Sequence, residues 1–272
     1  KHWAGLPIES IRYCLESESL SLADIDHVAI NTNPKANLLK KVCFTIKSRP
    51  DFKMVFDKIK TKKQRTSLVE KLQIAFLDST FVGKVHHIEH HLSHLASTHL
   101  VSPFENSVAI SVDGFGDFAS AAWGACYGQT IDVDQSVFFP HSLGIFYQAL
   151  TQFIGFPHYG DEYKVMGLAP YGKPKFVNQL SEVVQTNSDG TFELNLDFFR
   201  HHKENIKYEW SGGSPEVGSL FNGSAFEELL GVKVRNKNMP LDNRHYDLAH
   251  SIQAVYEEVF FNLLEVTHAK YG

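Results

Sequence analysis

The side chains with the clearest chemistry in this sequence are histidines concentrated in one short segment. Six of the 15 histidines occur in the run VHHIEHHLSHLASTHL. They are His86, His87, His90, His91, His94 and His99. An aspartate, Asp113, follows within the sequence DGFGD, at the end of an apolar run. Because proteins hold catalytic divalent metal ions with imidazole and carboxylate groups, this region is the first candidate for a metal site.

Spacing indicates which of these histidines could share one ion. Residues 90 to 100 contain no Gly or Pro and predict a helix, on which positions four apart lie about 5–6 Å from each other on one face. His90 and His94 could therefore reach the same ion, whereas His91 points about 100° away. With Asp113 from a separate strand, two imidazoles and one carboxylate suit Fe²⁺, and also Zn²⁺ or Mn²⁺. The alternative is a pair of surface histidines without a ligand.

A competing pattern lies in the same run. His86, Glu89 and His90 form the sequence HxxEH, which is typical of inverted zinc peptidases when it lies on a helix. The segment before His90 has Val85 and Ile88 at strand-like positions, and it follows Gly83. A strand there favours the metal site over the peptidase, and leaves His86, His87 and His99 as structural or exposed residues.

Composition limits the classes of protein that need to be considered. The chain has 272 residues, 43% of them hydrophobic, which is enough for one large or two medium lobes. Its formal net charge of −5 does not favour a nucleic-acid surface. Three separated cysteines predict no disulfide framework, and we expect a cytoplasmic location. No apolar run approaches the ~20 residues of a membrane helix, so we expect no membrane partner.

Hydrophobic periodicity predicts a mixed α/β chain. Strands are expected at 25–31, 84–89, 107–113, 118–128 and 190–196, with DGFGD as a tight turn between the third and fourth. Helices are expected at 6–15, within 50–78, and at 90–100, 142–154, 160–172 and 247–270. The chain starts at Lys1 and stops just after a helix, and we therefore interpret it as a piece of a longer protein, with two lobes meeting near residues 102–107.

Four spaced motifs carry a resemblance to a known family. HHLSH, SVDGFGD, FPHSLG and GDEYKVMGLAPYG occur in this order, and with them the chain resembles the amino-terminal domain of the nodulation- and antibiotic-type O-carbamoyltransferases. The resemblance implies an α/β, two-lobed, actin-like (ribonuclease-H-like) ATPase fold that is incomplete at both ends. Residues 1–104 would form the first lobe, without its opening strands, and residues 105–272 the second.

The resemblance also implies an activity. A carboxy-terminal YrdC-like domain, absent from this chain, would make carbamoyl-adenylate from carbamoyl phosphate and ATP. The domain seen here would then transfer the carbamoyl group to a hydroxyl of a small-molecule or sugar acceptor. The family's metal ion would be held by His90, His94 and Asp113, with a further ligand outside this chain, and we expect Fe²⁺, with Zn²⁺ or Mn²⁺ as alternatives. We accordingly expect the fragment not to catalyse the complete reaction.

Three more groups are candidates for work on the phosphate or the acceptor. Gly114 and Gly116 would let backbone N–H groups approach the phosphate of the adenylate. Lys164 could bind that phosphate or a developing oxyanion, or form an ion pair with Asp161 or Glu162. His141 could bind the acceptor or act as a base, or it could belong only to the start of a helix capped by Ser142.

Two other classes of function remain open from the sequence. The first is a protein similar to the tRNA threonylcarbamoyl transferases, against which the acidic net charge and the GLAPYG segment argue. The second is a non-catalytic, actin-like nucleotide-binding protein. Nucleotide binding that survives His90→Ala would favour the second, since the metal site predicts a weakened adenylate complex.

Overall fold

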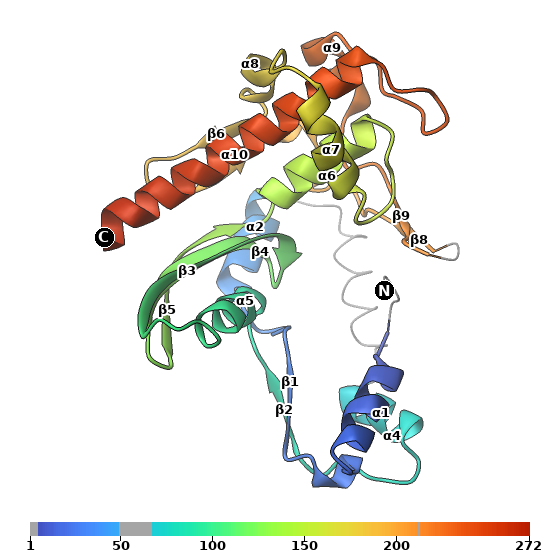
Figure 1. The fold of residues 1–272 in the computed structure, drawn as a ribbon, viewed down its shortest axis with the longest axis vertical. Coiled ribbons are helices and arrows are strands. Elements are labelled where there is room, and N and C mark those ends of the chain that lie inside the picture. The colour runs from blue at the N-terminus through green and yellow to red at the C-terminus, as the bar shows by residue number, and fades with distance from the viewer. Residues whose placement is uncertain (1–4, 49–66, 211–212) are drawn as a thin grey trace.

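The computed structural model describes residues 5–48, 67–210 and 213–272 (Figure 1). Helices and strands alternate along the first part of the chain, and a three-stranded sheet lies at the centre of the rest. The mixed α/β class is thereby confirmed. Part of the helical stretch predicted between residues 50 and 78 lies outside the described residues.

The central sheet is an antiparallel meander. It consists of β3 (Asn106–Gly116), β4 (Ala119–Tyr127) and β5 (Thr130–Phe138), in the order β3-β4-β5. The hairpin of β3 and β4 was predicted, but its turn was placed wrongly. The strand continues through DGFG, and the chain reverses at Asp117 and Phe118, which have φ angles of 50° and 78°. The two glycines misled the prediction because glycine usually marks a turn.

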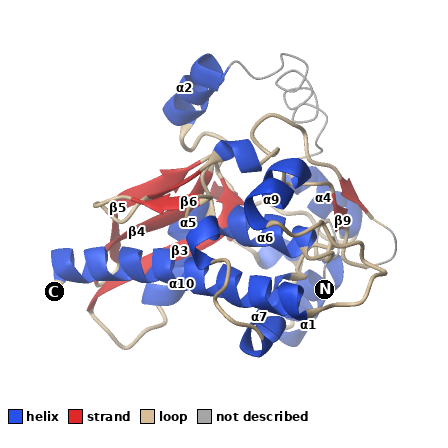
Figure 2. Cartoon of the chain, turned by 90° about the horizontal axis from the view of Figure 1, so that it is seen from above, coloured by secondary structure: helices blue, strands red, loops and turns tan. Residues whose placement is uncertain are grey.

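Helices cover both faces of this sheet, so β4 is buried almost throughout. On one face lies α5 (His90–His99), whose Leu95 packs with Ala109 and Cys126. On the other face, Trp123 of β4 joins the main core, to which α6 (Leu143–Phe153) and α10 (Asn243–Tyr271) contribute. Figure 2 shows α10 running alongside the sheet.

The start of the chain forms a smaller body below the sheet in Figure 1. It contains α1 (Ile8–Ser17), β1 (His27–Ile30), α4 (Leu68–Ala75) and β2 (Lys84–His87). The two strands pair in parallel, with His27 opposite Lys84, and β2 leads directly to the segment before α5. A separate apolar cluster holds this body together: Leu15, Leu22, Leu72, Phe76 and Phe81. The helix α2 (Leu38–Ser48), which the sequence did not predict, follows β1.

The remaining elements surround α6 and α10. They are α7 (Glu162–Leu168), the 3-10 turn η2 (Ala169–Tyr171), α8 (Val177–Leu180), the pair β6 (Val184–Thr186) and β7 (Phe192–Leu194), the 3-10 turn η3 (Leu196–Phe198), the pair β8 (Tyr208–Glu209) and β9 (Glu216–Val217), and α9 (Gly223–Leu230). The stripe predicted on the last helix is confirmed, since Leu248, Ile252 and Leu263 are fully buried. Among the described helices, none combines the length and apolarity that crossing a bilayer requires.

Candidate metal centre

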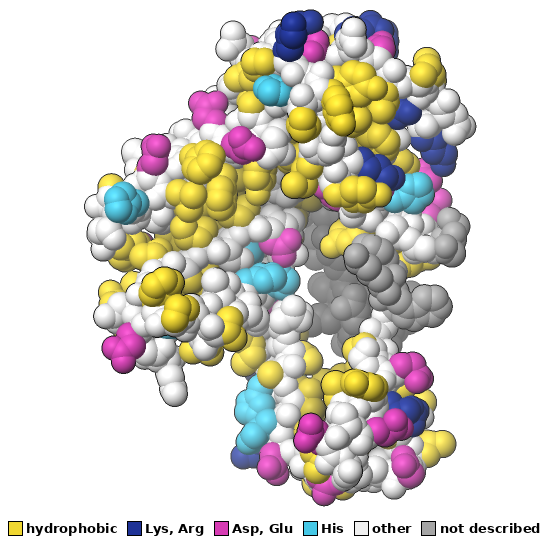
Figure 3. Space-filling model, viewed as in Figure 1, with side chains coloured by type: hydrophobic (Ala, Val, Ile, Leu, Met, Phe, Trp, Pro, Cys, Tyr) yellow, Lys and Arg dark blue, Asp and Glu magenta, His cyan; other side chains and the backbone are white. Residues whose placement is uncertain are grey.

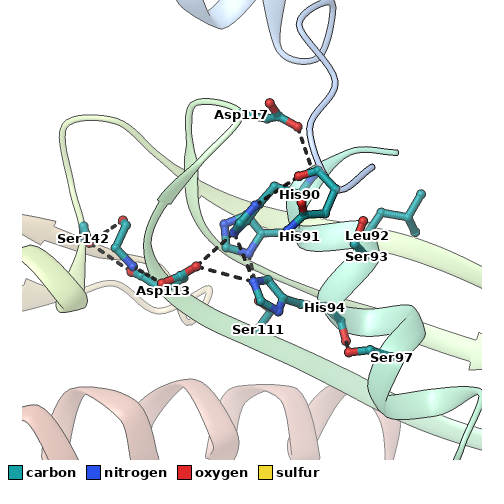
Figure 4. A network of polar contacts seen from close by, with 12 residues as sticks. His90, His91, Leu92, Ser93, His94, Ser97, Ser111, Asp113, Asp117 and Ser142 are labelled. Atoms are coloured by element: carbon teal, nitrogen blue, oxygen red, sulfur yellow. Dashed lines mark hydrogen bonds and ion pairs between the residues drawn. The ribbon is translucent and has the colours of Figure 1, made fainter. Parts of the chain in front are cut away.

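The helix α5 presents His90 and His94 on one face, because its start is fixed one residue before His90. The side chain of Glu89 caps the helix and accepts a hydrogen bond from the backbone N–H of Leu92 at 2.7 Å. His90 is therefore in the first turn, and His94 lies one turn later. Both side chains reach the edge of the sheet where Asp113 lies (Figure 4).

The same geometry rules out the HxxEH interpretation. His86 belongs to β2, where its Nε2 lies 3.0 Å from Nδ1 of His27. Glu89 precedes the helix and uses its carboxylate as the cap. A zinc-peptidase motif needs its histidines and glutamate on one helix, so the strand expected before His90 is confirmed and the peptidase alternative is excluded.

An irregularity in β3 aims Asp113 at α5. The register with β4 is regular up to the pair Val112–Ala121 and resumes only at Gly116–Ala119. Such a break re-aims side chains out of the regular alternation of a strand. Asp113 lies in this break, three residues before the strand ends, rather than at the tip of a hairpin as predicted.

The predicted convergence of the three side chains is confirmed. Oδ2 of Asp113 lies 2.9 Å from Nε2 of His90 and 3.4 Å from Nε2 of His94. The two Nε2 atoms are 3.1 Å apart, and all three ligand atoms lie within 4.8 Å of one another. A single ion could therefore contact one imidazole nitrogen from each histidine and one carboxylate oxygen.

The loop after β1 fixes the orientation of His90. Nδ1 of His90 lies 3.3 Å from the carbonyl oxygen of Asn31, which can only accept a hydrogen bond, so this contact uses the tautomer of His90 with a proton on Nδ1. Oδ2 of Asp117 accepts hydrogen bonds from the backbone N–H groups of His90 and Asn33, at 3.0 and 2.7 Å. These contacts are of the kind that orients a metal-bound histidine.

When Nδ1 of an uncharged His90 donates to Asn31, no proton lies between Nε2 of His90 and Asp113. With the proton on Nδ1, Nε2 of neutral His90 presents a lone pair to the carboxylate of Asp113. Two acceptors 2.9 Å apart repel each other unless a proton on His90 or a metal ion lies between them. Burial opposes ionisation of Asp113, but a hydrogen bond from His90, which requires a second proton on Nε2 of that ring, and one from the backbone N–H of Gly114 hold the pKa of Asp113 below its usual value. The donor set therefore fits a divalent cation.

The two glycines of the motif serve different purposes. A Cβ atom added to Gly116 would lie 1.9 Å from Cγ of His90, so the ring of His90 occupies the space above this glycine. A Cβ on Gly114 would meet nothing within 4 Å. The backbone N–H of Gly114 donates to Oδ1 of Asp113 at 2.6 Å. Binding of a phosphate by these backbone groups stays a prediction.

The start of α6 is hydrogen-bonded to the segment of β3 that contains Asp113. Oγ of Ser142, which is fully buried, accepts from the backbone N–H of Ile145 and lies 2.7 Å from the carbonyl oxygen of Gly114, to which it can donate. The predicted N-cap is thus confirmed. Gly144 is needed here as well, since its Cβ would lie 2.8 Å from the carbonyl oxygen of Asp113. This close approach between Gly144 and Asp113 was not predicted.

Asp113 also lines a cavity of about 420 Å³. Its walls come from β3, α6, α7, α10 and the loop before α7. The lining residues are Val112, Asp113, Gly114, Gly144, Tyr147, Gln148, Tyr159, Gly160, Glu162, Met166, Gln253 and Tyr256. Asp113 thus belongs both to the metal-ligand cluster and to the cavity wall. Figure 3 shows histidine and acidic side chains together at the hollow between the sheet and the smaller body.

Two predicted site residues are placed outside this group. Nζ of Lys164 forms an ion pair with Asp161 at 2.6 Å, which is one of the two alternatives considered from the sequence. Nδ1 of His141 accepts a hydrogen bond from the backbone N–H of Leu194 at 3.0 Å. Neither side chain is among the described residues that line the cavity beside Asp113. Their roles in catalysis stay predictions.

Comparison with known proteins places the sequence in one family. A family model described as "Carbamoyltransferase N-terminus" matches residues 1–272, and the chain belongs to that family. The resemblance carried by the four motifs is therefore confirmed.

Individual relatives match over most of the chain. It is 30% identical over 280 residues to the uncharacterized protein sll1178 of Synechocystis, with all of this chain covered, and 30% identical over 272 residues to the nodulation protein NolNO of Sinorhizobium fredii, with 97% covered. The nodulation protein NolO of Bradyrhizobium diazoefficiens is 32% identical over 180 residues, or 65% of the chain. The chain spans 43%, 34% and 28% of these three proteins.

Proposed function

We propose that this chain forms the part of an O-carbamoyltransferase in which a carbamoyl group passes from carbamoyl-adenylate to a hydroxyl of a small-molecule or sugar acceptor. One observation carries the proposal. In a chain of the carbamoyltransferase family, His90, His94 and Asp113 converge within 4.8 Å, and Asp113 also lines a cavity large enough for a small molecule. The architecture we propose is the two-lobed, actin-like fold, with lobes at 1–104 and 105–272.

We propose that the cluster holds a divalent metal ion, with Fe²⁺ preferred and Zn²⁺ or Mn²⁺ as alternatives. Two imidazole nitrogens and one carboxylate oxygen are a ligand set that all three ions accept. When bound, such an ion acts as a Lewis acid toward a carbonyl or phosphoryl oxygen. The protein orients its ligands through the contact of His90 with Asn31 and through the break in β3 that aims Asp113.

The residues of this chain have separate tasks in the proposed reaction. His90 and His94 come from α5, whereas the cavity is lined by residues of β3, α6, α7 and α10. The carbamoyl donor would lie next to the cluster, and the acceptor would approach from the cavity. Gly114 lies where a backbone group could contact the donor, and Lys164 or His141 could act only after a movement of their present partners.

The test uses the full-length protein that carries this chain. Carbamoyl phosphate, ATP and a panel of alcohols and sugars are supplied, and the carbamoyl ester is detected by mass spectrometry. His94→Ala removes one ligand and is expected to lower the rate at least about 100-fold and to reduce the bound metal. His86→Ala, which removes an exposed imidazole on β2, is the matched control and keeps both. Ester formation at the normal rate by His94→Ala would contradict the proposal.

A further inference from the structure

The cavity beside Asp113 has a distinctive balance of charge. Two of its lining residues, Asp113 and Glu162, are carboxylates, and the lining includes no Lys, Arg or His among the described residues. Within the described part of the chain, Glu162 joins no ion pair. Burial, and the nearby charge of Asp161, raise the pKa of Glu162. The neighbouring cation, Lys164, is bound to Asp161 instead.

Aromatic and amide groups complete the lining. Oη of Tyr147 donates to Oε1 of Gln253 at 2.8 Å, and Nε2 of Gln253 donates to Glu257 at 2.7 Å. This chain of bonds fixes the direction of the phenol and leaves its oxygen able to accept a further hydrogen bond. The ring of Tyr256 meets that of Tyr147 edge-on, with centroids 5.5 Å apart. Such rings offer flat apolar surfaces beside polar oxygens.

One polar group of the lining has no partner. Gln148 is 8% exposed, and its Nε2 is buried with no hydrogen-bond acceptor among the described residues. A buried amide hydrogen that stays unpaired costs free energy. Because Gln148 lines the cavity, a hydroxyl oxygen of a ligand held there could provide the missing acceptor after a small rotation of the amide.

We propose that this cavity is the acceptor subsite and that it selects a neutral or cationic polyhydroxylated molecule against an anionic one, with Glu162 as the residue that sets the charge preference. The inference rests on the proposed function, since it assigns the hydroxyl acceptor to a place. The carboxylate of Glu162 can accept hydrogen bonds from hydroxyl and ammonium groups and repels a phosphate or carboxylate of a ligand, whereas the charge of Asp113 is taken up by the proposed metal ion. The tyrosine rings and the Gln148 amide suit the apolar faces and hydroxyls of a sugar-like molecule.

Three sugars of the same shape and different charge test the selection. Binding of glucose, glucosamine and glucose 6-phosphate to the full-length protein is measured at pH 7 by saturation-transfer NMR, without a carbamoyl donor. Glucosamine is expected to bind at least as tightly as glucose, and glucose 6-phosphate at least about tenfold more weakly. Glucose 6-phosphate binding as tightly as glucose, or no binding of any of the three, would overturn the proposal.

Two substitutions connect the selection to the cavity. Glu162→Gln removes the charge with little change of shape and is expected to reduce the preference for glucosamine over glucose 6-phosphate. Met166→Lys places a cation on the cavity wall and is expected to strengthen glucose 6-phosphate binding and weaken that of glucosamine. Met166 is 55% exposed on α7, so this variant should fold even if Glu162→Gln does not. Glu265→Gln and Met239→Lys, at exposed positions outside the cavity lining, are the matched controls.

The outcomes separate this inference from the proposed function. Carbamoyl esters formed by the normal protein, together with an unchanged order of sugar affinities in both Glu162→Gln and Met166→Lys, would refute the subsite and leave carbamoyl transfer standing. The expected order of affinities, without ester formation from any acceptor, would support the charge selection of the cavity and count against the transfer reaction.

Discussion

Gly116 lies directly against the imidazole of His90. A Cβ atom at position 116 would lie 1.9 Å from Cγ of that ring, a distance that no real pair of carbon atoms keeps. The ring also contacts the carbonyl oxygen of Asn31 through its Nδ1 atom. Gly116 therefore contributes to the candidate metal site because its lack of a side chain leaves room for the ring of His90.

We predict that Gly116→Ala weakens metal binding. The added methyl group must displace the ring of His90, and disturbing the groups that orient a metal ligand typically costs 10–100-fold in affinity. Titration of the metal-free protein with Zn²⁺ or Co²⁺ by calorimetry measures the change. Gly114→Ala is the matched control, because its methyl group meets nothing within 4 Å. Equal affinities of the two variants would show that His90 is not a ligand.

We predict that two histidines of the same helix differ in what their loss affects. Both ring nitrogens of His99 have partners, the Ser107 hydroxyl and the Gly128 carbonyl oxygen, each at 2.8 Å, and the residue is 3% exposed. His99→Ala should lower the free energy of unfolding by about 1–3 kcal/mol and leave metal affinity unchanged. His94→Ala should lower metal affinity and leave the free energy of unfolding nearly unchanged, because that side chain is 45% exposed. Urea denaturation and metal titration of both variants distinguish these roles.

We predict that Ser142→Ala destabilises the protein. The hydroxyl accepts the backbone N–H of Ile145 at 3.1 Å and can donate to the carbonyl oxygen of Gly114 at 2.7 Å. Loss of an N-cap costs about 0.5–2 kcal/mol, and this one also joins α6 to β3. Thermal unfolding should show the loss. Ser181→Ala, at an exposed hydroxyl bonded only to Val177 within its own turn, should change stability much less.

We predict that His201 makes stability fall on acidification. Burial lowers the pKa of His201 to about 4, against a usual value of 6.5. The unfolded chain therefore takes up this proton at a higher pH than the folded protein does. The stability contributed by the neutral ring is complete above about pH 6.5 and is lost as the pH falls toward 4, by up to about 3 kcal/mol.

Substitution of His201 tests whether this residue causes the loss of stability at low pH. In His201→Gln an amide can still donate to the carbonyl oxygen of Pro140, as Nε2 does at 2.8 Å, but it does not titrate. The free energy of unfolding, measured from pH 4 to 7, should depend less on pH in the variant. The same pH dependence in both proteins would show that other groups are responsible.

Local sequence signals accounted for the helices that hold the site. Ser142 caps α6 as predicted, α5 begins at His90 as predicted, and the spacing of His90 and His94 follows from helix geometry alone. The convergence with Asp113 was predicted from residue types, since few arrangements other than a metal site use imidazoles and a carboxylate together. These features depend on neighbours within a few residues.

The features that were missed depend on residues distant in the sequence. The strand β5 was not predicted because most of its side chains are exposed or half-buried, and its hydrophobic pattern is weak. The glycines of DGFGD predict a turn beyond Asp113, where the structure continues β3 to Gly116. The reason for Gly116, its contact with His90, is visible only in three dimensions. The cavity residues Tyr147, Glu162 and Tyr256 come from three helices, and no spacing in the sequence connects them.

Asp113 is shared between two places where something can bind, the histidine cluster and the cavity. A cation that takes up part of its negative charge would change the field felt by any molecule in the cavity, and a molecule there would change the hold on the cation by the same factor. Occupancy on one side of this carboxylate is thus thermodynamically linked to occupancy on the other. A sugar titration repeated with and without the ion would measure that coupling in either direction.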